Sequence, residues 1–293
     1  MKEPILIAAL CLVAFLSEVM KPTPALPQEA QPTIKKLPVD GLKRIPEEQN
    51  LSKEFVRGMG LVRSRYSSDT PYGVMVAVSP HPVRDGEASL RLELRAGDCG
   101  KAGVGGRYPA DDCKSRKDRI ELRSQISAIK RNTRGQYGWS LYLPEDFELN
   151  DPEPPDTYLV QFHELSEDPN VKYPTPFALG YGKGKASPFG AVPGLVIRRS
   201  VDLDPAYDDW HERTAILEEE LRGRWHDFRV DAYWRSKKDG YFRLYVDDKL
   251  VYDFSGPTIQ GRNGFLRLGF YRFNVVIGRS PTVVMYLDKI WRK

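Results

Sequence analysis

The sequence predicts an all-β sandwich, and three observations support that fold class. Short segments alternate apolar and polar side chains with a period of two, which is the pattern of half-buried strands. Turn residues separate these segments at short intervals, and helical periodicity is nearly absent. The chain has 293 residues, of which 41% are hydrophobic and 29% charged, so it is long enough to bury one large core in a single domain.

The N-terminal part has the features of an export signal followed by a linker. An apolar run over residues 5–16 is too short to span a membrane and fits a signal peptide. We assign residues 1–30 to the signal peptide and the start of a linker, and residues 31–54, rich in proline and charge, to the linker itself. The β-domain is expected over residues 55–293. The protein is therefore expected to be secreted or periplasmic, without stable membrane insertion after cleavage; uncleaved anchoring is the alternative.

The cysteines predict one disulfide. Of the three, Cys11 falls within the signal, and Cys99 and Cys113 remain as a pair in an oxidising compartment. A bond between them would close a loop that contributes roughly 3 kcal/mol of stability in the chain-entropy model. A metal site is the alternative, but no further cysteine or histidine lies near this pair in the sequence.

The alternating segments are expected to form strands along the whole domain. They lie at residues 73–78, 88–95, 119–124, 137–143, 158–164, 225–234, 241–246, 250–254, 265–273 and 283–291. Two stretches without alternation, residues 146–157 and 170–193, are interpreted as long loops, and the second has a length typical of functional lids. One short helix is expected at residues 216–221.

The strand at residues 158–164 displays a polar pair. Because side chains alternate across a strand, Val160 and Phe162 should point into the core, and Gln161 and His163 should stand together on the opposite face. A lone histidine on a strand is more often structural than functional. The neighbouring glutamine makes a functional site the stronger interpretation.

Two further strands repeat this arrangement. Their outward positions are Arg119, Glu121 and Arg123 in one strand and Arg267 and Tyr271 in the other. The structural alternatives are a cross-strand ion-pair ladder for the charged residues and a packed surface ring for the tyrosine. If the three strands line one concave sheet, these side chains form a site suited to a charged sugar chain.

Charge and carboxylate patterning narrow the function. The formal net charge of +4 suits an anionic partner, and the lack of a long lysine and arginine run makes nucleic acid a poor candidate. A glycoside hydrolase needs two carboxylates across the scissile bond. The acidic run Glu218-Glu219-Glu220 lacks strand alternation, so it is interpreted as a solvated face.

Several segments in a fixed order resemble one family. They are residues 92–100, 112–113, 119–122, 139–144, 161–163 and 268–272. Together they resemble secreted bacterial polysaccharide lyases of the heparin lyase I and glucuronan lyase-like group, from about residue 73 onward. The resemblance implies a concanavalin-like jelly roll, related in fold to the alginate lyases. By similarity to those enzymes it implies a catalytic site of Arg119, Gln161, His163 and Tyr271.

The resemblance also implies a reaction, the β-elimination of a uronic-acid polysaccharide. Gln161 and Arg119 would bind the carboxylate and stabilise the enolate-like charge. His163 or Tyr271 would remove the proton, and Tyr271 is suited to return one to the leaving oxygen. Further substrate contacts are expected from the neighbouring charged residues, Arg123, Glu121, Arg267 and Arg272.

Specificity and cofactor are less defined by the resemblance. The longer lysine-containing motif of the alginate lyases is replaced here by Leu-Gly-Phe-Tyr-Arg at residues 268–272, so alginate specificity does not transfer. Calcium is a candidate cofactor because related lyases bind it, although no ligands can be matched. We expect a monomer. The main alternative function is a non-catalytic carbohydrate-binding protein on the same scaffold, which would leave the polymer intact.

Overall fold

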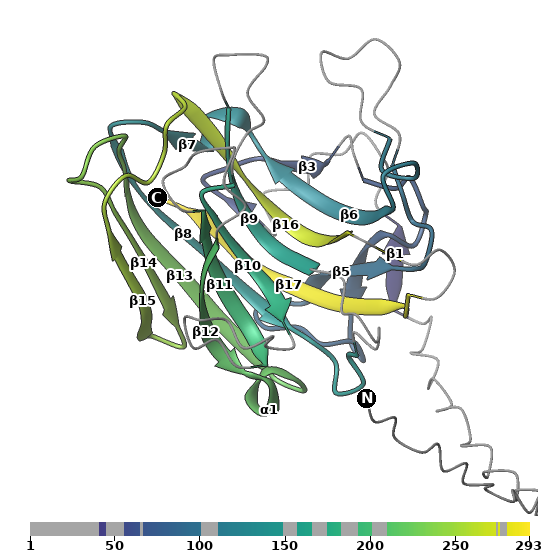
Figure 1. The fold of residues 1–293 in the computed structure, drawn as a ribbon. Coiled ribbons are helices and arrows are strands. Elements are labelled where there is room, and N and C mark those ends of the chain that lie inside the picture. The colour runs from purple at the N-terminus through teal and green to yellow at the C-terminus, as the bar shows by residue number, and fades with distance from the viewer. Residues whose placement is uncertain are drawn as a thin grey trace, which may run out of the picture. The chain divides into compact units, whose positions relative to one another are not determined.

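The described residues consist almost entirely of two β-sheets (Figure 1). The computed structural model describes residues 41–44, 56–64, 67–100, 111–148, 157–165, 175–182, 193–200, 210–273, 275 and 280–293. The compact unit that contains them extends from Pro38 to Lys293. The expected signal peptide lies outside the described residues.

The first sheet brings together strands from both ends of this unit. Its strands are β1 (Leu42–Arg44), β2 (Val56–Arg57), β4 (Val74–Val78), β5 (Ala88–Leu94), β8 (Thr133–Tyr142), β13 (Trp225–Trp234), β14 (Tyr241–Val246), β15 (Lys249–Ser255) and β17 (Val283–Arg292). They follow the order β1-β4-β5-β17-β8-β13-β14-β15, with β2 beside β17. Neighbours run antiparallel except β2 and β17, which are parallel.

The second sheet carries the polar strands. It consists of β3 (Leu61–Arg63), β6 (Lys117–Ser124), β7 (Ile129–Lys130), β9 (Thr157–Leu165), β10 (Phe177–Gly182), β11 (Gly194–Ser200), β12 (Trp210–Leu217) and β16 (Asn263–Phe273). The order is β12-β11-β10-β9-β16-β6-β3, with β7 beside β16. The strands β9, β16 and β6 are therefore consecutive in this sheet, which meets the condition that the three polar segments line one sheet (Figure 1).

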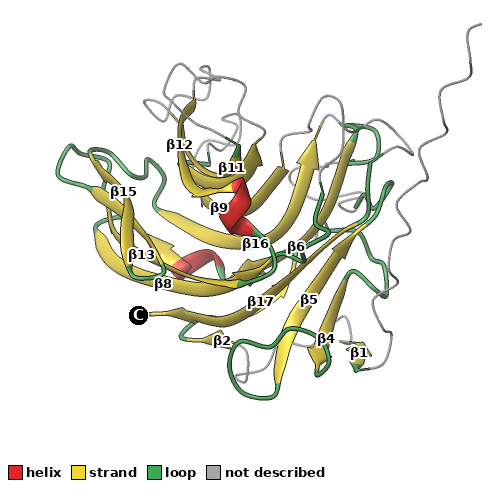
Figure 2. Ribbon diagram, turned by 90° about the horizontal axis from the view of Figure 1, so that it is seen from below, coloured by secondary structure: helices red, strands yellow, loops and turns green. Residues whose placement is uncertain are grey.

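The two sheets form the layers of a sandwich, with the apolar core between them (Figure 2). Phe162 and Phe177 of the second sheet meet Trp234 and Phe242 of the first. The rings of Phe177 and Phe242 stack with centroids 3.9 Å apart. Burying each such aromatic side chain stabilises the fold by about 2–3 kcal/mol, so this cluster joins the layers. The predicted all-β sandwich is confirmed.

Every expected strand is present, and burial on both faces explains two of the strands that were not expected. The expected strands at residues 225–234 and 241–246 match β13 and β14 at both ends. By contrast β10, which lies inside the expected loop at residues 170–193, and also β11 and β12 were not anticipated. The residues of β10 whose burial is described, 177–181, are all buried, and β11 is nearly so. A strand buried on both faces shows no alternation, so its pattern is lost.

Four smaller findings complete the fold. The short helix α1 spans Glu218–Leu221, within the expected segment. β1 pairs with β4 and falls inside the segment assigned to the linker, so the folded unit begins earlier than residue 55. The expected disulfide joins Cys99 and Cys113, whose Cα atoms lie 5.1 Å apart. In the described part of the chain, no helix is long and apolar enough to cross a membrane.

A β-bulge in β16 depends on a glycine. The register between β16 and β9 shifts between Leu268 and Tyr271, and Gly269 has a φ of +139°. A Cβ atom at Gly269 would lie 2.2 Å from the carbonyl oxygen of Ile120 and 2.7 Å from the Cα of Glu121. Glycine therefore lets β16 approach β6 closely, directly beside the polar strand faces.

Replacing Gly269 with alanine should destabilise the fold strongly. The new methyl group would force β16 and β6 apart and also strain the backbone, for a loss of about 3 kcal/mol or more in the free energy of unfolding. Gly86→Ala is the control, because Gly86 also has a positive φ, +70°, but a Cβ atom there would have no other atom within 4 Å. That variant should lose only about 1 kcal/mol. Denaturant unfolding measures both, and equal losses would contradict the close approach.

Candidate active site

Glu121, in β6, is a buried carboxylate that binds side chains from three neighbouring strands. Its side chain is 1% exposed. Its Oε1 accepts a hydrogen bond from Gln161 Nε2 of β9 at 2.5 Å. Its Oε2 accepts from Arg119 Nη1 of β6 at 3.2 Å and from Arg267 Nη1 of β16 at 3.1 Å. One ionised side chain thus fixes a group from each of the three strands through charge-assisted bonds.

The contact continues from Gln161 to His163. His163 Nε2 lies 3.1 Å from Gln161 Oε1. Because the amide nitrogen of Gln161 donates to Glu121, its oxygen faces His163, and Nε2 of the imidazole is the donor. The tautomer therefore leaves the lone pair on Nδ1, which lies 3.3 Å from Thr175 Oγ1. The imidazole also stacks on Phe265, with ring centroids 5.2 Å apart.

Its surroundings keep His163 uncharged at neutral pH. Desolvation lowers the pKa of His163 well below its ordinary value of 6.5, and the positive charges of Arg267 and Arg119 lower it further. A neutral imidazole with a defined tautomer can accept a proton.

Tyr271 lies at the other end of the same network. It stands opposite Arg119 in the register of β16 and β6, and the guanidinium carbon of Arg119 lies 3.9 Å from the centroid of its ring. The ring is half-buried, and among the described residues its hydroxyl has no hydrogen-bond partner. Contacts therefore run without a break from His163 through Gln161, Glu121 and Arg119 to Tyr271.

All four residues expected at the catalytic site lie on one face of the second sheet. Leu266, Leu268 and Phe270 of β16 are buried in the core, which leaves Arg267 and Tyr271 on the opposite face. Arg123 also lies on that polar face, opposite Arg267 in register, with its guanidinium carbon 5.6 Å from the Phe265 ring centroid.

Two of the expected substrate contacts need correction. Arg272 is fully buried, pairs with Asp118 at 3.0 Å and donates to the carbonyl oxygen of Pro281 at 2.9 Å. Its side chain lies on the same face of β16 as the core residues Leu268 and Phe270. The Arg272–Asp118 ion pair is therefore structural, and Arg272 cannot reach a substrate. Glu121 is likewise too buried to bind a polymer, and its contacts show that it orients Gln161 and the two arginines instead.

Four neighbours of this face were not expected from the sequence. Phe265 could have been found, because it is two positions from Arg267 on β16 and so shares its face. Arg198 of β11 is 5% exposed and pairs in register with Ala178 of β10. Ala178 pairs in register with Gln161 of β9, so Arg198 and Gln161 lie on the same face of the sheet. Thr175 and Asp112 come from outside the strands, and no periodicity signals them.

The described residues do not supply a metal centre. Calcium was a candidate cofactor, but nowhere in the described ranges do three or more His, Cys, Asp or Glu side chains gather so as to hold a metal ion.

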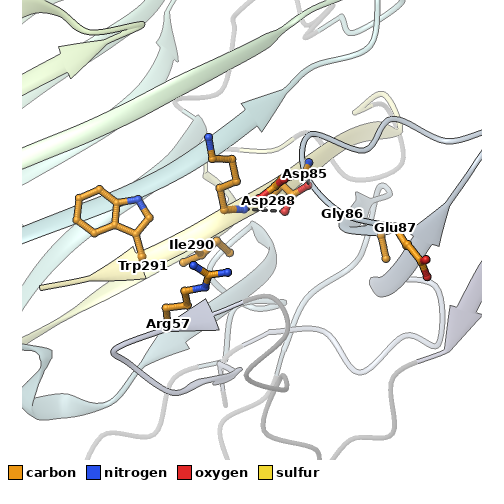
Figure 3. A pocket seen from close by; sticks show the side chains of 9 residues that line it. Arg57, Asp85, Gly86, Glu87, Asp288, Ile290 and Trp291 are labelled. Atoms are coloured by element: carbon orange, nitrogen blue, oxygen red, sulfur yellow. Dashed lines mark hydrogen bonds between the residues drawn. The ribbon is translucent and has the colours of Figure 1, made fainter.

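A pocket of about 330 Å³ lies on the first sheet, beside β17 and the loop before β5 (Figure 3). Arg57, Glu87, Lys289 and Trp291 are among the residues that line it. The buried carboxylate there, Asp288, accepts hydrogen bonds from the backbone nitrogens of Arg84, Asp85 and Lys289. This carboxylate anchors a loop, and none of the expected catalytic residues borders the pocket.

Comparisons with known proteins show the family and the fold of the chain. Residues 72–291 match the family model of polysaccharide lyases, so the chain belongs to the polysaccharide lyase family and is a polysaccharide lyase. An endo-β-1,4-glucuronan lyase from the fungus Trichoderma reesei shares the fold with a TM-score of 0.55 and 16% identity, over 83% of this chain and 95% of that one.

Two further solved structures are more distant. An alginate lyase from Pseudomonas aeruginosa gives a TM-score of 0.44 and 11% identity over 70% of this chain and 82% of that chain. An alginate lyase from Zobellia galactanivorans gives a TM-score of 0.45 and 11% identity over 77% of this chain and 81% of that chain. No curated protein matches the sequence. The predicted family and the jelly-roll sandwich are confirmed.

The lowered pKa of His163 has a measurable consequence for stability. The unfolded chain binds a proton at His163 near pH 6.5 that the folded protein does not bind. The stability linked to this residue is therefore fully present above that pH and is lost as the pH falls toward the folded pKa, by up to about 1.4 kcal/mol per unit. His163→Gln should show a shallower loss between about pH 7.5 and about pH 5 in denaturant unfolding. Parallel slopes for the two proteins would contradict a desolvated, neutral imidazole.

Proposed function

We propose that the protein cleaves a uronic-acid polysaccharide by β-elimination on the polar face of the second sheet. The observation that carries this proposal is the continuous network from His163 to Tyr271, centred on Glu121. It places an amide, guanidinium groups, a neutral imidazole and a phenol on one face. Elimination from a uronate requires those kinds of groups: carboxylate binding, proton removal and proton return.

Gln161 and Arg119 bind the substrate carboxylate in this proposal. Four arginines lie on this face: Arg119, Arg123, Arg198 and Arg267. Positive charge on this face favours an anionic polymer. It also stabilises the negative charge that develops on the carboxylate when the neighbouring C5–H bond breaks.

His163 and Tyr271 carry the proton transfers. His163 accepts the C5 proton at Nδ1, after Thr175 has moved aside, and Tyr271 donates its hydroxyl proton to the departing O4 oxygen. The C5–H electron pair forms the new double bond and the C4–O4 bond breaks, so no water is added. Both residues must come within roughly 3 Å of their protons once substrate is bound.

We further propose that the protein is secreted or periplasmic and acts as a monomer. The apolar run at residues 5–16 and the Cys99–Cys113 disulfide support export to an oxidising compartment.

The experiment is a screen of uronate polymers for ultraviolet absorbance, which the conjugated unsaturated product of elimination gives and intact polymer does not. A β-1,4-linked glucuronan is the first polymer to test, because the Trichoderma reesei enzyme with the same fold is a glucuronan lyase. An increase in absorbance is expected with at least one uronate polymer and none with neutral glucans. Binding without absorbance would identify a non-catalytic carbohydrate-binding protein and overturn the proposal.

Two substitutions test the assigned roles. Tyr271→Phe and His163→Ala should each lower kcat by about 100-fold or more, the usual scale for losing acid–base help. Polymer binding should be largely retained. Tyr233→Phe is the matched control, because Tyr233 is a half-buried tyrosine on β13 of the other sheet, and its kcat should equal that of the parent. Near-full activity in either site variant would remove that residue from the mechanism.

A further inference from the structure

Asp112 is a second buried carboxylate that holds Arg119. Its Oδ2 accepts from Arg119 Nε at 2.8 Å and its Oδ1 from Arg119 Nη2 at 3.3 Å. This two-point contact fixes both the position and the plane of the guanidinium. The side chain of Asp112 is 3% exposed. With Glu121 on Nη1 and Tyr271 against its face, Arg119 is held on several sides.

The disulfide joins the two segments that contact Arg119. Asp98 precedes Cys99, and the carbonyl oxygen of Asp98 accepts from the backbone nitrogen of Arg119 at 2.7 Å. Asp112 precedes Cys113, and its carboxylate binds the side chain of the same arginine. The backbone nitrogen of Asp112 also donates to the carbonyl oxygen of Gly100 at 3.1 Å. The disulfide therefore links the segment that holds the backbone of Arg119, at Asp98, to the segment that holds its guanidinium, at Asp112.

We propose that Asp112 is a positioning residue for Arg119 and that the Cys99–Cys113 disulfide keeps Asp112 in place, so that full lyase activity requires the oxidised pair. The inference rests on the proposed function, since Arg119 affects turnover only if it binds the substrate carboxylate. Burial raises the pKa of Asp112, which the charge of Arg119 only partly offsets. A carboxylate in such a place moves toward water when its segment is released, and Arg119 then loses its two-point contact.

The first test compares two neighbouring substitutions. Asp112→Asn keeps the size of the side chain but removes its charge. Asp111→Asn is the matched control, because Asp111 lies on the same segment and, among the described residues, its carboxylate accepts only from the backbone nitrogen of Lys114, at 3.1 Å. On the polymer that the parent cleaves, Asp112→Asn should lower kcat by about 10- to 100-fold, the scale of a misplaced catalytic group. Asp111→Asn should match the parent, and an unchanged kcat in Asp112→Asn would overturn the proposal.

A mutant cycle tests the part played by the disulfide. Cys99→Ser/Cys113→Ser is made in the parent and in Asp112→Asn. If the bond acts through Asp112, its removal should lower kcat in the parent and leave kcat unchanged in the Asp112→Asn background. A disulfide that only stabilises the fold would lower Tm in both backgrounds and kcat in neither, which would contradict the proposed coupling.

A labelling measurement makes the test independent of activity. Phenylglyoxal modification of arginines, mapped by mass spectrometry, should be faster at Arg119 in Asp112→Asn than in the parent. Arg267 is the internal control, because Glu121 holds it and its labelling rate should not change. An equal rise at both arginines would mean general loosening and would overturn the positioning role. Selective labelling in a protein that cleaves no uronate polymer would instead overturn the proposed function and leave the positioning role standing.

Discussion

The polar face of the second sheet depends on the buried carboxylate of Glu121. A buried charge is tolerated only when it is paired and hydrogen-bonded. Glu121 meets that condition by binding Gln161 and the guanidinium groups of Arg119 and Arg267. Removing any one partner would leave the others imperfectly paired in a low-dielectric site. The same interactions that make the carboxylate tolerable therefore hold the candidate catalytic groups at fixed positions.

Such an arrangement suits chemistry on a charged polymer. Elimination gains most when the groups that stabilise developing charge are oriented before the substrate arrives. Here the backbone contributes to that order, because the glycine at position 269 lets β16 lie close against β6. The contacts of Asp112 add a constraint from outside the sheet. The imidazole of His163, kept neutral by desolvation and by nearby arginines, completes the set.

Strand alternation accounts for what could be predicted. β13 and β14 alternate cleanly because one face of each is partly solvated, so their limits could be read from the sequence. The same period placed Gln161 and His163 together on the outward face of one strand and Tyr271 on the outward face of another. β10 and β11 are buried on both faces and carry no such pattern. Arg272 was assigned to the substrate on its charge alone, although its phase in β16 is that of the core residues.

Contacts across the sheet and from loops could not be predicted from periodicity. The bond between Glu121 and Arg267 depends on the pairing of β6 with β16, whose residues are distant in the sequence. Asp112 reaches Arg119 from a segment outside the strands, next to a cysteine of the disulfide. These contacts depend on how distant segments pack together, and no local pattern in the sequence predicts that packing.

The most direct measurement is a crystal structure of the Tyr271→Phe variant with a uronate oligosaccharide from a polymer that the parent cleaves. We expect the oligosaccharide to lie across β6, β16 and β9, with one carboxylate within hydrogen-bonding distance, roughly 3 Å, of Gln161 and Arg119. On the sugar ring that carries this carboxylate, C5 should face His163 and O4 should face residue 271. An oligosaccharide bound only on the first sheet, for instance in the pocket beside Lys289 and Trp291, would contradict the assignment of the active site.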